Sequence, residues 1–366
     1  MKKIMLVFGT RPEAIKMCPL VKELGRRGKF KLSVCVTGQH REMLDGVLGL
    51  FGVVPDRDLA VMREGQTLFE ITERVLCRMR GALEAERPDA VLVHGDTTTA
   101  FAAALACFYM KIPVCHVEAG LRTHDLRSPY PEEFNRQAVG VIAELHFAPT
   151  ERARQNLLAE GKDEKKIFVT GNTAIDALKT TVRQTHSHPA LSWSGGNRII
   201  LLTAHRRENL GEPMRELFRA VKEILKKYGD TRVIYPLHMN PLVREIAAEK
   251  LADCDRVMLT EPLDAVDFHN VMARSYLVIT DSGGIQEEAP ALGVPVLVAR
   301  DTTERPEGVE AGTLKLVGTD RESIFREADL LLSDKSAYQK MAQAVNPYGD
   351  GHACERICDI LEVFFA

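Results

Sequence analysis

The chain has 366 residues, of which 45% are hydrophobic and 27% are charged. These shares are typical of soluble globular proteins and exclude a disordered, collagen-like or low-complexity chain. The 48 basic and 51 acidic side chains leave a net charge of −3, which is too small for a protein that coats nucleic acid or an anionic membrane. At roughly 150 residues per domain, the length predicts two domains.

No stretch of the sequence is long and apolar enough to span a bilayer, and the N-terminus lacks the pattern of a signal peptide. The eight cysteines are scattered without a CxxC pair, so we expect reduced thiols in a cytoplasmic protein. The sequence contains no HExxH, Walker A or GxGxxG motif. It therefore predicts no metal site, no P-loop and no dinucleotide cofactor.

Short apolar runs alternate with longer amphipathic runs in the first half of the chain. Residues 12–27 and 67–80 predict helices, and the apolar runs predict buried parallel strands, at residues 4–8, 32–37, 90–94, 114–117, 145–148 and 167–170. This alternation predicts a doubly wound α/β domain over residues 1–182.

The alternation stops at residues 183–197, where Pro, Gly, Ser and His dominate, and we interpret this segment as a linker. It then resumes over residues 198–345 and predicts a second α/β domain, with strands at residues 199–203, 233–236, 257–259, 277–280, 294–298 and 314–317. Residues 346–366 predict a turn and a C-terminal helix that packs across the domain junction. Since such sheets bind ligands beyond the carboxyl ends of their strands, we expect a cleft at the domain interface.

The first predicted strand is followed by a helix start that suits an anion. Thr10 and Glu13 have the spacing of a capping box. Arg11 and Lys16 flank the same helix N-terminus, where free backbone N–H groups favour negative charge. Taken alone, these residues are better explained by an ordinary helix cap with solvated charges.

Three carboxylates follow later strands of the first domain. Asp96 and Glu118 each follow a strand beside a glycine, and Glu132 opens a helix after a Pro-Tyr-Pro turn. Each acid alone is explained by first-turn stabilisation of a helix. Three together favour catalysis, because crowded carboxylates differ in protonation and so divide the roles of acid and base.

The second domain offers a histidine and a glycine turn at its strand ends. His205 follows the first strand of this domain and could donate to a phosphate or a leaving oxygen. Ser282, Gly283 and Gly284 lie between a strand and a helix, which is the pattern of a phosphate cradle built from backbone N–H groups. Glu288, one turn into that helix, suits the hydroxyls of a ribose.

Two further residues complete this predicted nucleotide site. Arg305 follows the next strand and could bind a phosphate through two N–H groups. Phe268 could offer an aromatic face to a base, although packing in a core is the commoner role of a Phe.

The motifs as a set span residues 9 to 351 in order and resemble the non-hydrolysing UDP-N-acetylglucosamine 2-epimerases of bacteria. They are GTRPEAIK, TGQHREML, VHGDTTT, HVEAGLR, PEEFNRQ, TAHRREN, YPLHMNP, TDSGGIQEEAP, RDTTERPEG and NPYGDG. The resemblance implies a glycosyltransferase-B fold of two Rossmann-like domains and a homodimer. It also implies a place in cell-surface polysaccharide biosynthesis, with the particular polysaccharide left open.

The activity implied by the resemblance is interconversion of UDP-GlcNAc and UDP-ManNAc without NAD, metal or another cofactor. UDP is eliminated to give 2-acetamidoglucal and is added back with the opposite configuration at C2. The C2 proton becomes acidic only as the C1–O bond to UDP loosens and oxocarbenium character develops. Such a site needs a held diphosphate, carboxylates that stabilise positive charge, and a base.

The same resemblance assigns a role to each candidate residue. Asp96, Glu118 and Glu132 are the acid/base and electrostatic groups, and the choice of C2 base among them stays open because they titrate together. His205 assists at the departing UDP. Glu288 binds the ribose, and Phe268 with the Leu263 backbone lies near the uracil. The diphosphate is held by Arg11, Lys16, Ser282, Gly283, Gly284 and Arg305.

Some members of this family bind a second UDP-GlcNAc as an activator beside the active site. The positions that match are Gln39, His40, Glu132, Arg206 and His238. Glu42 and Gly65 stand where those members carry Gln and Arg. Because an acidic side chain and a lost cation both disfavour a diphosphate, we expect little or no activation.

Three alternative functions remain open. A hydrolysing 2-epimerase that releases ManNAc differs only in the access of water. A glycosyltransferase-B enzyme shares the fold and the nucleotide sugar, but acceptor activation needs fewer than three carboxylates. A non-catalytic nucleotide-sugar sensor would keep the phosphate cradle and would have no need of the carboxylates.

Overall fold

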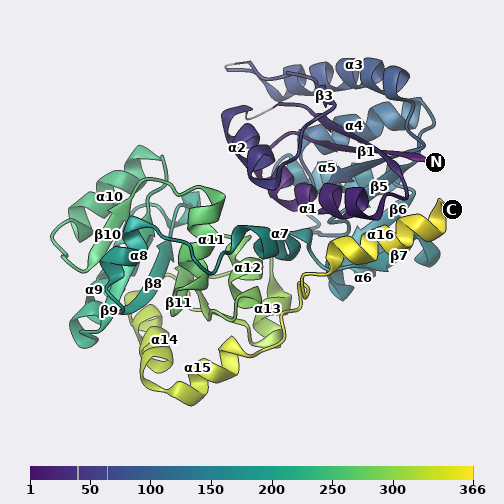
Figure 1. The fold of residues 1–366 in the computed structure, drawn as a ribbon. Helices are drawn as coiled ribbons and strands as arrows, with labels where there is room; N and C mark the ends of the chain where they lie inside the picture. The colour runs from purple at the N-terminus through teal and green to yellow at the C-terminus, as the bar shows by residue number, and fades with distance from the viewer. Residues whose placement is uncertain (39–40, 64, 366) are drawn as a thin grey trace. The chain divides into compact units, whose positions relative to one another are not determined.

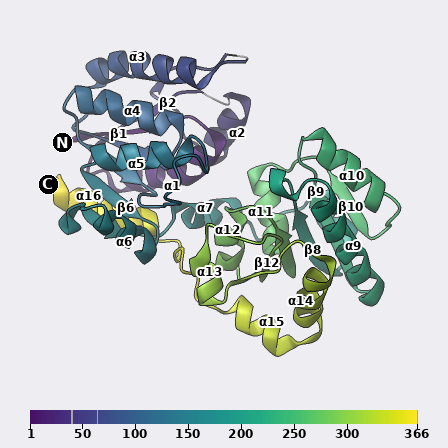
Figure 2. The same ribbon diagram turned by 180° about the vertical axis from the view of Figure 1, so that it is seen from behind.

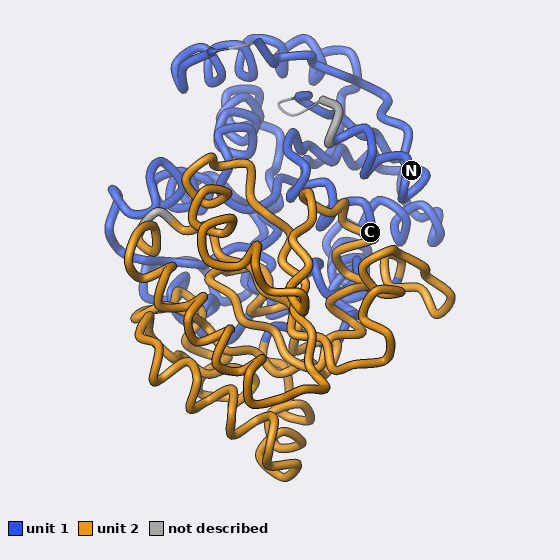
Figure 3. Tube along the Cα trace, turned by 90° about the vertical axis from the view of Figure 1, so that its left-hand side faces the viewer, with its two compact units in different colours: residues 1–179, 348–366 blue, residues 180–347 orange. Residues whose placement is uncertain are grey.

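The computed structural model describes residues 1–38, 41–63 and 65–365, the side chains of residues 41–43 and 207 excepted. Within these ranges the chain forms two compact units, Met1–Lys179 with Tyr348–Ala366 (unit 1) and Thr180–Pro347 (unit 2) (Figure 3). Each unit is a parallel sheet covered by helices (Figures 1 and 2), which confirms the predicted doubly wound α/β class. None of the helices in these ranges combines the length and the apolar character needed to cross a membrane.

Unit 1 is built on a parallel sheet with the strand order β3-β2-β1-β4-β5-β6-β7. Its strands are β1 (Lys3–Phe8), β2 (Lys31–Val36), β3 (Arg57–Asp58), β4 (Ala90–His94), β5 (Val114–Val117), β6 (Leu145–Ala148) and β7 (Ile167–Val169). Its helices are α1 (Arg11–Arg27), α2 (Arg41–Phe51), α3 (Leu68–Glu86), α4 (Thr98–Tyr109), α5 (Glu132–Ile142), α6 (Glu151–Ala159), η1 (Glu164–Lys166), most of α7 (Thr173–Thr181) and α16 (Ala353–Phe364).

The sheet of unit 1 changes its direction of growth between β1 and β4. Because crossovers between parallel strands are right-handed, the helices on the two sides of this point cover opposite faces. On one face Ile4, Leu6 and Phe8 pack in a core with residues of α1, α2 and α16. On the other face Met5 and Val7 pack in a core with residues of α3 and α4. The carboxyl ends of β1 and β4 therefore form the point at which such sheets bind ligands.

Unit 2 has the strand order β10-β9-β8-β11-β12-β13, with the same change of direction between β8 and β11. Its strands are β8 (Arg198–Thr203), β9 (Thr231–Pro236), β10 (Val257–Thr260), β11 (Leu277–Thr280), β12 (Val296–Val298) and β13 (Leu314–Leu316). Its helices are α8 (Pro189–Ser194), η2 (Arg207–Asn209), α9 (Glu212–Lys227), α10 (Pro241–Leu251), α11 (Ala265–Ala273), α12 (Ile285–Ala291), α13 (Pro306–Ala311), α14 (Arg321–Ser333) and α15 (Lys335–Ala342).

The segment predicted as a linker, residues 183–197, belongs to unit 2 and contains α8. His188 caps this helix by accepting a hydrogen bond from the Ala190 N–H. The segment is held to unit 2 by His186, whose Nε2 is 2.8 Å from Asp267 Oδ1, and by Trp193, whose ring lies 4.7 Å from the Arg232 guanidinium. The turn-forming residues of this segment therefore flank a helix that packs on unit 2. The boundaries between the two units lie after Lys179 and after Pro347.

The C-terminal helix α16 is part of unit 1. Its residues Ile357 and Leu361 are fully buried in the same core as α1 and α2. Its N-terminus is capped by Asp176 of α7, whose carboxylate accepts hydrogen bonds from the Ala353 N–H at 3.2 Å and the Cys354 N–H at 2.9 Å. The chain therefore returns to complete the first unit after it has formed the second.

Candidate functional site

The predicted capping box at the start of α1 is present and is tied to a neighbouring strand. Glu13 is 2% exposed and accepts hydrogen bonds from the Gly9 N–H at 3.0 Å, the Thr10 N–H at 2.7 Å and the Thr97 hydroxyl at 2.6 Å. Burial raises the pKa of Glu13 in spite of these donors. Glu13 thus joins the loops after β1 and β4. Arg11, at the first position of the helix, is exposed.

Glu118 lies directly after β5 in a left-handed backbone conformation, with φ at 62°. Its carboxylate forms an ion pair with Lys16 of α1 and accepts a hydrogen bond from Asn172 Nδ2 at 3.0 Å. Both contacts are made by Oε2 of Glu118, and Nε2 of His94, at the end of β4, is 3.8 Å from this oxygen. Because burial lowers the pKa of His94 to about 4, this histidine is neutral near pH 7 and Lys16 supplies the positive charge.

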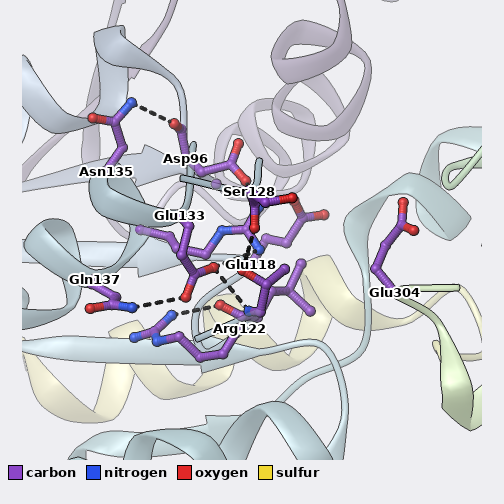
Figure 4. Close-up of polar contacts among 12 residues, drawn as sticks. Asp96, Glu118, Arg122, Ser128, Glu133, Asn135, Gln137 and Glu304 are labelled. Carbon is purple, nitrogen blue, oxygen red and sulfur yellow. Dashed lines mark hydrogen bonds and ion pairs between the residues drawn. The ribbon is translucent and has the colours of Figure 1, made fainter. Parts of the chain in front are cut away.

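Asp96 follows β4, the strand next to β5, so the two predicted carboxylates leave the sheet at the same edge. Its carboxylate forms an ion pair with Arg136 of α5. The Asn135 side chain donates to the backbone carbonyl of Asp96 at 2.9 Å (Figure 4). Helix α5 therefore positions Asp96 through two consecutive residues.

Glu133 organises the loop that follows β5. It is fully buried and accepts hydrogen bonds from the Thr123 N–H at 3.0 Å, the His124 N–H at 3.2 Å and Gln137 Nε2 at 2.8 Å (Figure 4). Burial raises its pKa, but these donors and the nearby Arg136 charge outweigh burial and hold the pKa below its usual value. Glu133 is thus an ionised group with a structural role.

Glu132, the third predicted carboxylate, is the first residue of α5 and is partly exposed. Within the described residues its side chain makes no hydrogen bond or ion pair. The two adjacent acids therefore differ: Glu133 is buried beneath a loop, and Glu132 is accessible to a ligand.

His205 lies in the loop after β8 of unit 2. Its ring stacks on that of His238, with centroids 5.1 Å apart and planes at 17°. Burial lowers the pKa of His205, and the charges of His238 and Arg206 add to this effect, whereas Asp281 opposes it. The protonation of His205 is thus set by competing neighbours at one strand end.

The predicted glycine turn joins β11 to α12. Gly284 occupies the cap position of α12, and no side chain in the described part of unit 2 caps this end. A Cβ atom on Gly283 would lie 2.8 Å from Glu304 Oε1, so the close approach of the loop before α13 favours glycine there. The backbone of Ser282 is held by the Thr280 hydroxyl, which accepts its N–H at 2.9 Å.

Two arginines stand beside this turn, each already paired with a carboxylate. Arg305, a predicted diphosphate ligand, forms an ion pair with the buried Glu287. Arg206 donates to Glu304 Oε1 at 3.1 Å. Burial raises the pKa of Glu304, but Arg305 and Arg300 outweigh it and lower that pKa to about 2. The cations are therefore held in place by fixed negative charge.

The predicted ribose and base contacts lie around α11 and α12. Glu288 Oε2 is 3.5 Å from Nε2 of His269, whose Nδ1 is 2.8 Å from the Thr181 hydroxyl. Phe268 meets the His269 ring edge to face at 6.2 Å and is partly exposed, as is Leu263 before α11. Within unit 2, Glu288 is thus held next to the element that carries Phe268.

The predicted activator positions are described only in part. Gln39, His40 and the side chain of Glu42 lie outside the described residues. Gly65 has a positive φ of 69°, and a Cβ atom added there would meet no described atom within 4 Å. Arg206 and His238 are described: Arg206 donates to Glu304, and His238 stacks on His205.

Three residues that the sequence patterns did not single out hold the predicted site residues in place: Arg136, Asn172 and Asp281. Asn172 and Asp281 follow β7 and β11 closely, so the rule of residues at strand ends, applied to every strand, would have found them. Arg136 lies one helical turn after Glu132 and Glu133, which was a weaker signal. Among the described residues no three His, Cys, Asp or Glu side chains are grouped so as to hold a metal ion.

Comparisons with known proteins place the whole chain in one family. The family model for UDP-N-acetylglucosamine 2-epimerase matches residues 22–362. The UDP-N-acetylglucosamine 2-epimerase of Bacillus subtilis is 60% identical over 98% of this chain and 94% of its own length.

Two solved structures are similar over the whole chain. Staphylococcus aureus MnaA, solved with UDP, is 53% identical with a TM-score of 0.90, covering 100% of this chain and 97% of that one. The UDP-GlcNAc 2-epimerase of Neisseria meningitidis, solved bound to UDP-GlcNAc, is 47% identical with a TM-score of 0.89, covering 98% and 99%.

Proposed function

Because this chain belongs to the UDP-N-acetylglucosamine 2-epimerase family and is an isomerase of a nucleotide sugar, we propose that it interconverts UDP-GlcNAc and UDP-ManNAc without hydrolysis. UDP leaves from C1 as the C2 proton is removed, which gives 2-acetamidoglucal. UDP then adds back to C1, and a proton returns to the opposite face of C2. Atoms and charge balance without an external oxidant or reductant.

One observation carries this proposal: two carboxylates stand at the ends of adjacent strands, each beside a fixed cation. Glu118 is paired with Lys16, and Asp96 is paired with Arg136. Loosening of the C1–O bond places positive charge on the sugar, and preorganised carboxylates stabilise that charge without reorganising. The C2 base is one of Asp96, Glu118 and the accessible Glu132.

Unit 2 supplies the nucleotide contacts in this proposal. The uncapped turn presents the N–H groups of Gly283 and Gly284 and the Ser282 hydroxyl to the diphosphate, with help from Arg305. In unit 1, Arg11 and Lys16 are the proposed diphosphate ligands. Glu288 binds the ribose, and uracil lies by Phe268 and the Leu263 backbone. The relatives solved with UDP and with UDP-GlcNAc support a nucleotide sugar as the ligand.

The biological setting is part of the same proposal. We expect a cytoplasmic homodimer that supplies a sugar donor for cell-surface polysaccharide. The thiols are free, six of the eight being buried, which suits a reducing compartment. The exposed apolar residues Phe108, Tyr109 and Val141 on the adjoining helices α4 and α5 suit a subunit interface.

The test is to incubate the protein with UDP-GlcNAc alone in D₂O and to follow the sugar by NMR. We expect UDP-ManNAc with deuterium at C2, since the proton is exchanged with solvent. Free ManNAc as the product would show a hydrolysing 2-epimerase instead. Absence of exchange at C2 would contradict the proposal and leave a glycosyltransferase or a sensor.

A further inference from the structure

Unit 2 contains a buried carboxylate to which the proposed reaction gives no task. Asp281 is the first residue after β11 and is fully buried. Strand β11 pairs with β8, and the hydroxyls of Thr280 and Thr203, at the ends of these strands, are 2.6 Å apart. Asp281 and the loop that carries His205 therefore leave the sheet side by side, at the point where the strand order reverses.

The two oxygens of Asp281 have different surroundings. Oδ2 accepts hydrogen bonds from the N–H groups of His205 and Arg206, both at 2.9 Å, and from Asn209 Nδ2 at 3.2 Å. Oδ1 is buried and has no hydrogen-bond partner within the described residues. Nε2 of His205 lies 3.9 Å from this oxygen. A buried polar atom without a hydrogen-bond partner calls for an explanation.

We propose that Asp281 is the positioning residue of His205: its Oδ2 fixes the backbone of the loop, and its Oδ1 receives the Nε2–H of the ring when ligand is bound. In the charged ring, which takes up a second proton from solvent and is stabilised by Asp281, Nδ1–H then faces the departing diphosphate and donates a hydrogen bond to it as negative charge develops. The role of His205 at the diphosphate rests on the proposed function. The pairing of Asp281 with His205 does not depend on it.

The remaining neighbours of His205 determine what this pairing does. His238 covers one face of the ring, and Arg206 adds positive charge that is shared with Glu304. The Tyr235 hydroxyl donates its proton to the Ala204 carbonyl at 2.8 Å. Asp281 is therefore the negative group that offsets burial, His238 and Arg206 around His205. A carboxylate that orients a histidine and stabilises its charged form is a recurrent catalytic device.

The first measurement is made on the unsubstituted protein, so it does not depend on the folding of a variant. Long-range ¹H–¹⁵N correlation spectra of the UDP-bound protein, recorded above the pKa of His205, identify which ring nitrogen carries the proton, with His205→Gln used for assignment. We expect the neutral ring to be protonated at Nε2, toward Asp281. A ring protonated at Nδ1 would overturn the proposal.

The second measurement uses Asp281→Asn. The amide oxygen can still accept the three N–H groups, while the amide nitrogen places a donor opposite Nε2. We expect a lower pKa of His205 and a fall in kcat of about 100-fold, with UDP affinity changed less than about 3-fold. Asp320→Asn is the matched control, because Asp320 also accepts a backbone N–H, from Ser323 at 2.9 Å at the start of α14.

A double-mutant cycle separates positioning from general damage. If Asp281 acts through His205, Asp281→Asn causes no further loss of kcat in a His205→Gln background. Additive losses in the two backgrounds would assign Asp281 a purely structural role and overturn the proposal. If the unsubstituted protein shows no exchange at C2, the proposed function fails, whereas the tautomer and the pKa of His205 still decide whether the pairing exists.

Discussion

At the scale of single residues, Glu118 combines an unfavourable backbone with a highly organised side chain. A left-handed conformation costs a residue with a Cβ about 1–2 kcal/mol, and Glu118 adopts one directly after β5. Lys16 and Asn172 hold its carboxylate, and both come from distant parts of the sequence. Backbone strain that surrounding contacts maintain is typical of functional sites, which supports the role proposed for Glu118.

Asp96→Asn tests the carboxylate at the end of the neighbouring strand. The substitution removes the negative charge beside Arg136 and keeps the shape of the side chain. We expect deuterium exchange at C2 to fall at least about 100-fold while calorimetry shows little change in UDP affinity. Asp89→Asn is the control, since Asp89 lies at the opposite end of β4 and pairs with Lys2 at 3.0 Å. Loss of UDP binding in Asp96→Asn would assign Asp96 a structural role instead.

At the scale of elements, α16 is joined to α1 by charge as well as by apolar contact. Arg27 of α1 donates to Asp359 at 2.5 Å, to Glu362 at 3.1 Å and to the Glu355 carbonyl at 3.0 Å. Glu23 accepts a further hydrogen bond from Arg27 at 2.7 Å, so it holds that guanidinium in place. The last helix of the chain is therefore an integral part of unit 1.

The stability of this contact should depend on pH through Glu23. The hydrogen bond from Arg26 lowers the pKa of Glu23 most, and Arg27 lowers it further. Together they outweigh burial and bring this pKa to about 2 from the usual 4.5. A depressed carboxyl pKa stabilises the fold above pH 4.5, and this contribution is lost as pH falls toward 2. We expect urea denaturation to show Glu23→Gln less stable than the unsubstituted protein at pH 7, with the difference shrinking below pH 4.5. Glu73 is exposed, so Glu73→Gln is the control and should show no change of stability difference with pH. A stability difference for Glu23→Gln that stays constant with pH would refute this role of Glu23.

At the scale of the whole molecule, the net charge of −3 conceals a local arrangement of cations. Lys16, Arg206 and Arg305 are each paired with a carboxylate of their own unit. Such cations create no broad positive field of the kind that attracts a polyanion. Cations paired in this way are compatible with the small dianionic diphosphate of the proposed function.

Kinetic cooperativity is also a property of the whole molecule. Because Glu42 and Gly65 weaken the expected activator site, we predict that initial velocity plotted against UDP-GlcNAc concentration gives a Hill coefficient near one. The double variant Glu42→Gln/Gly65→Arg should raise that coefficient, since it exchanges an acid for an amide and adds a cation. A coefficient clearly above one in the unsubstituted protein would contradict this prediction.

Local pattern predicted most of the architecture correctly. Each predicted strand is present, with ends within two residues of the prediction. Strand β3 was missed because its residues, Arg57 and Asp58, are both exposed and charged. The division into units was shifted at both ends, since residues 183–197 look like a linker in composition and only their contacts with Asp267 and Arg232 show that they are docked.

The sequence by itself determined the two α/β units, the capping box at Thr10 and Glu13, and the placement of charged residues after the strands, because these depend on periodicity and on nearest neighbours. Only the tertiary structure decided which side chains meet. Glu132 and Glu133 are adjacent in the sequence, yet the packing of α5 buries one and leaves the other accessible. Asn172 reaches Glu118, and Asp281 reaches the loop of His205, through the order of strands in each sheet. That order is set by long-range packing, which local sequence does not encode.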